Sequence, residues 1–101
     1  MLTIKPLNVS QLRSLMGFKS QEELRYDLEN FVKKKKLNAN FNLPKLSGIE
    51  NNSYVLTETE YKALNKYFEK HLGADVRMDI IAIRRDADNK LISPQSGEEF
   101  N

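Results

Sequence analysis

The 101-residue sequence contains no cysteine, no tryptophan and only one histidine. The absence of cysteine excludes a disulfide framework, a thiolate zinc site and a cysteine nucleophile, and it is compatible with a reducing cytosol. A single imidazole cannot form a paired-histidine metal site, and it leaves no plausible Ser-His-Asp triad. Glycine-rich phosphate loops and nucleophile elbows are also missing. The sequence therefore predicts no enzyme activity, no bound metal and no cofactor.

Long hydrophobic runs are missing as well. The longest aliphatic run, residues 80–83, is far too short to span a bilayer, and the first ten residues contain no apolar segment long enough for a signal peptide. Apolar residues make up 40% of the chain and charged residues 30%, which is typical of a globular domain rather than a disordered chain. We therefore expect a single small cytoplasmic domain over residues 1–93, followed by a frayed tail over 94–101.

Two helices are expected in the first third of the chain. The first is short and ends at Gly17, because glycine adopts the left-handed conformation without a Cβ clash. The second is expected over residues 20–38, where Ser20 and Glu23 form a capping box ahead of an apolar stripe with helical spacing. The stripe consists of Leu24, Leu28, Phe31 and Val32.

The remaining two thirds of the chain predict two antiparallel hairpins and one further helix. The sequences KLSGI and SYVLT flank Glu50-Asn51-Asn52, which is typical of a hairpin turn. A helix is expected over 57–73, where Thr57 and Glu60 form a second capping box. A strand over 76–85, a DADN turn and a short return strand, KLIS, then follow. The expected fold class is therefore α+β, with three short helices in the order α-α-β-β-α-β-β and a winged-helix-like N-terminal half.

The strand expected over residues 76–85 is apolar on both faces near its centre. Alternation places Ile81 and Ile83 on the face opposite Ile80. Either a helix covers each face, or Ile81 and Ile83 form an exposed apolar patch that marks a protein interface. Arginine is favoured at such interfaces, and several arginines of this strand flank its apolar centre. The interface predicted for a protein partner or a second copy consists of Arg77, Asp79, Ile81, Ile83, Arg84 and Arg85.

Positive charge is concentrated at the start of the chain. Residues 1–37 contain eight lysines and arginines against four acidic residues, whereas residues 38–101 contain eight against ten. The run Lys33-Lys34-Lys35-Lys36 can neutralise the phosphates of a nucleic acid. Cations in the last turn of a helix also interact favourably with the helix dipole, and four consecutive residues point to all sides of a helix. Both interpretations of the lysine run stay open.

Residues 12–37, LRSLMGFKSQEELRYDLENFVKKKKL, combine a short helix, a glycine-containing turn and a longer helix. This pattern resembles the helix-turn-helix of the winged-helix half of LexA-type repressors. The resemblance implies binding to duplex DNA. The residues of this segment expected to contact nucleic acid are Lys19, Arg25, Lys33, Lys34 and Lys36.

Glu22 and Glu23 lie in the turn from which such a helix reads base edges, where nearby phosphates would repel them. The favoured hypothesis is therefore a non-catalytic protein-binding module, such as an adaptor, an assembly component or a small inhibitor of the kind that viruses encode. Binding of duplex DNA is the alternative.

Overall fold

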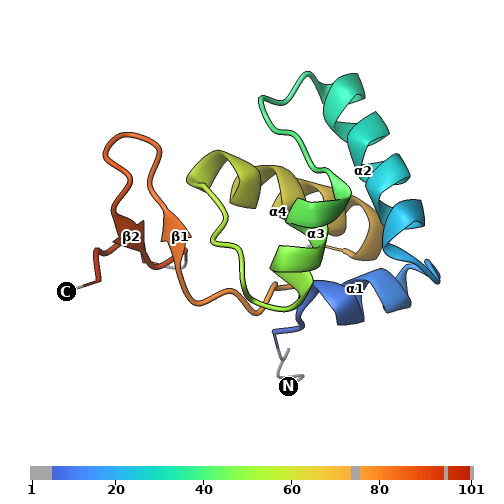
Figure 1. The fold of residues 1–101 in the computed structure, drawn as a ribbon, viewed down its shortest axis with the longest axis horizontal. Coiled ribbons are helices and arrows are strands. Elements are labelled where there is room, and N and C mark those ends of the chain that lie inside the picture. Colours follow the sequence, from blue (N-terminus) through green and yellow to red (C-terminus); the bar gives the residue numbers. More distant parts are fainter. Residues whose placement is uncertain (1–5, 74–75, 95, 101) are drawn as a thin grey trace.

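The computed structural model describes residues 6–73, 76–94 and 96–100 of the chain. In this part of the chain, four helices precede a two-stranded antiparallel sheet, so the predicted α+β class is confirmed. The helices pack together, and the hairpin lies at one end of the molecule beside the C-terminus (Figure 1). The elements are α1 (Val9–Leu15), α2 (Gln21–Lys35), α3 (Leu43–Glu50), α4 (Glu58–Leu72), β1 (Ile83–Arg84) and β2 (Leu91–Ile92).

Helix α4 begins with the predicted capping box, whereas the box at the start of α2 is altered. The Thr57 side chain accepts a hydrogen bond from the backbone of Glu60, and the Glu60 carboxylate accepts one from the backbone of Thr57. At α2, Ser20 caps the backbone N–H of Glu23, but the Glu23 carboxylate accepts from the backbone of Lys19, at 3.1 Å. Both arrangements give partners to N–H groups that a helix start leaves without one.

Helix α3 replaces the hairpin that was predicted over residues 45–57. The Asn42 side chain caps it by accepting from Lys45 N at 2.9 Å, and Pro44 lies in the first turn, where its missing N–H costs nothing. The chain then reverses, because the backbone N–H groups of Ser53 and Tyr54 both donate to the carbonyl of Gly48. A Cβ atom at Gly48 would lie 2.7 Å from the Tyr54 Cβ, so this close approach requires glycine.

One core joins the helices and the hairpin. The buried stripes of α2 and α4 pack against side chains from α1, α3 and the hairpin, and an ion pair of 3.0 Å between Arg13 Nε and Glu50 Oε1 links α1 to α3. Residues without measurable exposure include Leu12, Leu24, Leu28, Phe41, Leu46, Leu64 and Tyr67.

Among the residues that the structure describes, the strand expected over residues 76–85 is paired only near its two ends. Met78 forms an isolated parallel bridge with Leu7, and β1 pairs with β2 so that Ile83 lies opposite Ile92. Residues 79–82 lie in no strand or bridge. Both predicted parts of the hairpin, the turn after Arg85 and the return strand, are present.

Residues 96–100 differ from the frayed tail that was predicted. They fold back along β2, where Glu99 forms an antiparallel bridge with Ile92 and the backbone N–H of Phe100 donates to the carbonyl of Leu91 at 3.0 Å. Backbone pairing therefore extends the hairpin by a third segment. Among the helices of the described residues, none combines the length and the apolarity needed to cross a membrane.

Candidate functional site

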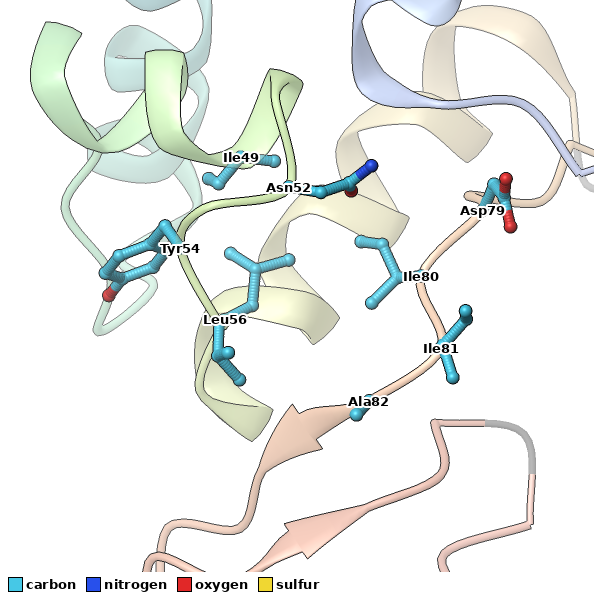
Figure 2. A pocket seen from close by; sticks show the side chains of 9 residues that line it. Ile49, Asn52, Tyr54, Leu56, Asp79, Ile80, Ile81 and Ala82 are labelled. Carbon is cyan, nitrogen blue, oxygen red and sulfur yellow. The ribbon is translucent and has the colours of Figure 1, made fainter.

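An apolar hollow of about 300 Å³ lies between two segments that are far apart in sequence, residues 49–56 and residues 79–82 (Figure 2). Just beyond it the two segments meet, because Arg84 N donates to the Leu56 carbonyl at 2.8 Å and Thr57 forms a parallel bridge with Arg84. The hollow is lined by Ile49, Asn52, Tyr54, Val55, Leu56, Asp79, Ile80, Ile81 and Ala82.

The two isoleucines predicted to share an interface lie in different environments. The Ile81 side chain is 77% exposed at the hollow, whereas Ile83 is 3% exposed and packs in the core. Alternation holds from Met78 to Ala82, with the even-numbered side chains inward, and shifts by one residue where β1 begins. Ile83 therefore turns inward to pair with β2, and the prediction that it faces a partner is corrected.

The predicted rim of charged residues is not gathered around the hollow. Asp79 lines it, but Arg77 lines a separate depression beside Tyr61. Arg84 is exposed and donates to the Asn89 carbonyl at 2.9 Å.

Arg85 is held within the hairpin. Its guanidinium donates to Asp88 through two nitrogen atoms, at 2.6 and 3.1 Å, and also to Glu99. These hydrogen bonds raise the pKa of Arg85 and lower the pKa of Asp88 to about 2. Asp88 and Glu99 thus pair with the Arg85 guanidinium within the chain, so its charge needs no group from a partner protein.

Sequence reasoning missed most of the residues that line the hollow. Tyr54 and Leu56 were assigned to a hairpin strand, so their packing opposite residues 79–82 was not foreseen. The apolar triplet Tyr54-Val55-Leu56 after a polar turn was the available signal. The Tyr54 hydroxyl donates to the buried carboxylate of Glu60 at 2.9 Å, and the Tyr54 ring points away from Ile80 and Ile81 (Figure 2).

The residues predicted to contact nucleic acid divide between the two ends of α2. Lys33, Lys34 and Lys36 are exposed at its C-terminal end. Lys19 precedes its N-terminus, roughly 20 Å away for a helix of 15 residues.

Arg25 lies near the N-terminal end of α2, and its guanidinium is occupied by carboxylates of the same helix. It donates to Glu22 and, at 2.9 Å, to Glu29. These hydrogen bonds raise the pKa of Arg25, and the Arg25 hydrogen bond lowers the pKa of Glu22. The five predicted residues therefore do not form one continuous basic surface.

The single histidine belongs to the contact between α2 and α4. His71 Nε2 lies 3.8 Å from Asp27 Oδ2, and the same carboxylate oxygen accepts a hydrogen bond of 2.6 Å from the buried hydroxyl of Tyr67. Within residues 6–73, 76–94 and 96–100, no cluster of three or more acidic or histidine side chains has a geometry suited to a metal ion.

No family model, no curated protein and no solved structure matches this chain. The surfaces of the chain are therefore the features from which its function is inferred.

Proposed function

We propose that this chain is a non-catalytic protein-binding module, an adaptor, an assembly component or a small inhibitor, which binds a partner protein or a second copy at the hollow between residues 49–56 and 79–82. The observation that carries the proposal is the 77% exposure of Ile81 beside an apolar hollow. A single exposed isoleucine is ordinary, but here Val55, 40% exposed, lines the same concave surface. The proposed location is the cytoplasm, with which a cysteine-free sequence is compatible.

An apolar segment is the occupant that would gain most from binding in the hollow. Burying one isoleucine side chain completely contributes roughly 1.5–3 kcal/mol to association. Interfaces of this kind have an apolar centre with a polar edge, and Asn52 and Asp79 supply polar groups beside the apolar lining. Both groups are exposed and can form hydrogen bonds with a partner's backbone.

Paired isoleucine substitutions test the surface. Ile81→Glu should leave the far-UV circular dichroism and the thermal midpoint nearly unchanged, because the side chain is exposed, whereas Ile83→Glu should unfold the chain by burying an unpaired charge. A photoreactive benzoylphenylalanine at position 81 should then form adducts with a partner or a second copy, and Val55→Glu should abolish them.

The control places the same photoreactive residue at Tyr26, which is 66% exposed on α2 and outside the hollow. Docking at the hollow would be refuted if the yield of adducts were equal at positions 81 and 26. It would also be refuted if adducts still formed in the Val55→Glu variant. Unfolding of Ile81→Glu would contradict the exposed placement itself.

Duplex DNA binding is supported by one observation, the exposed lysines at the C-terminal end of a helix that follows α1 and a glycine-containing turn. Two other observations weigh against the helix-turn-helix mode. The first turn of α2 carries Glu22 and Glu23, and Arg25 is already paired with carboxylates. The geometry therefore supports the protein-binding proposal better than the DNA alternative.

A further inference from the structure

A second, larger groove lies where the C-terminal part of α2 meets α4. It has a volume of about 630 Å³ and is open to solvent along one side. Residues from the end of α2 and from the second half of α4 contribute to it, so no local sequence pattern could reveal it. It is lined by Phe31, Lys35, Leu37, Lys66, Glu69 and Lys70.

Three of the residues lining this groove are lysines whose charges are not neutralised. In the part of the chain that the structure describes, the lysines that form ion pairs are Lys45, Lys62 and Lys90. Lys35, Lys66 and Lys70 form no ion pair with any described residue, although Glu69 lies in the same groove. Three unpaired cations around one concavity attract an anionic ligand.

The helix dipole accounts for only part of this arrangement. Lys35 and Lys70 lie in the last turns of their helices, where a cation is favourable without any ligand. Lys66 lies one to two turns before the end of α4, where the dipole effect has largely fallen off. The helix dipole therefore does not explain the position of Lys66 on this groove, and binding of a ligand is the better explanation.

The floor of the groove is apolar. Phe31 is 7% exposed, its ring packs edge-to-face against Tyr67, and the Lys70 ammonium lies 5.5 Å from the ring centroid. Leu37 is half-buried beside it. Apolar side chains at the bottom and ammonium groups at the rim form an amphipathic surface.

We propose that this groove binds an acidic amphipathic segment of another protein. The apolar side chains of the segment would cover Phe31 and Leu37, and its carboxylates would pair with Lys35, Lys66 and Lys70. A groove between two helices with an apolar floor is suited to an amphipathic helix. This site is separate from the hollow of the proposed function, with which it shares no residue.

Other anionic ligands fit the groove less well. A phosphodiester backbone could pair with the lysines, but it has no apolar groups to cover the side chains of Phe31 and Leu37. A flat anionic membrane cannot enter a concave groove. An acidic amphipathic peptide can cover the apolar floor with its apolar side chains and pair its carboxylates with the lysines at the rim.

The test uses the full chain and a fluorescent 18-residue helical peptide with leucines on one face and glutamates on the other. Fluorescence anisotropy measures its affinity for the unchanged protein and for a Lys66→Glu, Lys70→Glu double variant. Reversing two exposed charges should weaken binding by about tenfold, since each reversal removes an exposed ion pair with the peptide and adds a repulsion. Amide chemical shifts should change at Phe31 and Leu37 when the peptide is added.

The matched controls separate the groove from general electrostatics and from the proposed function. Lys19→Glu reverses one charge outside the groove, half the change of the double variant, and should leave the affinity within about twofold, as long-range attraction is screened by salt. Ile81→Glu should also have no effect on this peptide. A peptide of the same composition with its leucines dispersed should bind at least tenfold more weakly.

Five results would overturn the proposal: no binding of the peptide, equal affinity for the dispersed peptide, an equal loss of affinity in Lys19→Glu, tighter binding of a random DNA duplex, or tighter binding of phosphatidylserine vesicles. Tighter duplex binding that falls steeply with salt would instead favour nucleic acid as the ligand of these lysines. Because Ile81→Glu is measured in parallel, failure here leaves the proposal for the hollow unaffected.

Discussion

Tyr67 lies at the centre of the contact between α2 and α4. Its side chain is fully buried, and its ring packs edge-to-face against Phe31 and Phe68 with centroids 5.3 Å apart in both cases. The hydroxyl donates to Asp27 Oδ2 at 2.6 Å. Burial, together with the Asp27 carboxylate, raises the pKa of Tyr67 far above its ordinary value. One residue thus supplies apolar packing and a charge-assisted hydrogen bond between two helices.

Tyr67→Phe should reduce the free energy of unfolding at neutral pH by about 1.5 kcal/mol, because a hydrogen bond to a charged group is lost. Since the pKa is raised on folding, the tyrosine contributes stability that is fully present below its unfolded pKa of about 10 and is lost at higher pH. The alkaline fall in stability should therefore be shallower in Tyr67→Phe.

Urea denaturation between pH 7 and pH 11 measures both effects of this substitution. Tyr26→Phe, at an exposed position on the same helix as Asp27, is the control and should leave the neutral-pH stability unchanged. An unchanged midpoint at neutral pH in Tyr67→Phe would show that the Asp27 hydrogen bond contributes nothing.

At the level of the element, α2 ends in a residue that is poorly suited to its conformation. Lys36 has φ 55° and ψ 41°, in the left-handed region, and the backbone N–H of Leu37 donates to the carbonyl of Val32 at 3.0 Å. Glycine is the usual residue at such a C-terminal cap, because a side chain there costs about 1–2 kcal/mol. The sequence had suggested that the helix ends at Asn38.

Lys36→Gly should therefore stabilise the protein by about 0.5–1 kcal/mol. Glycine relieves the backbone strain at this position, and this gain is larger than the free-energy cost of the added entropy of the unfolded chain. Lys34→Gly, two residues earlier and inside the helix, should destabilise it by about 1 kcal/mol. Both lysines are exposed, so the two variants differ in backbone conformation rather than in buried contacts. Shifts of the same sign in urea midpoint would contradict the left-handed cap.

At the level of the whole molecule, Glu60 connects three separate segments. Its carboxylate lies 2.6 Å from Lys45 Nζ of α3, accepts from the Tyr54 hydroxyl, and caps α4 through the backbone of Thr57. Lys45 Nζ in turn donates to the carbonyl of Asn40 at 2.8 Å. Burial raises the pKa of Glu60, but the Lys45 ammonium, the Thr57 N–H and the Tyr54 hydroxyl together lower it below 4.5.

Glu60→Gln should cost about 2–3 kcal/mol at neutral pH, because it leaves the Lys45 ammonium without its anion. A lowered pKa means that this stability is present above the unfolded value of 4.5 and is lost as pH falls through the folded value. Acid unfolding should accordingly be less steep in Glu60→Gln.

Glu58→Gln, in the same turn but paired with Lys62 at 3.7 Å on the surface, is the matched control for this charge removal. It should change the free energy of unfolding by less than about 1 kcal/mol. If the two variants were equally stable from pH 3 to pH 7, the Glu60 network would have no role in holding α3 against α4.

The two long helices, their N-terminal caps and the C-terminal hairpin could be predicted because their signals are local. Ser20, Thr57 and Gly73 mark helix ends through backbone geometry within a few residues. Helix α3 was mistaken for a strand, although Asn42 and Pro44 form a helix-start signal, because the Glu50-Asn51-Asn52 turn was given more weight. The environment of Ile83 could not be read from alternation, because its burial depends on pairing with Ile92.

The sequence by itself determined the α+β class, the basic first third and the absence of cysteine, since each depends on composition or on spacing along the chain. Only the tertiary structure decided which side chains share a surface. It placed Val55 beside the same hollow as Ile81, and Lys66 beside the same groove as Lys35. Packing of non-local segments around one core brings these residues together, and no short-range pattern records such packing.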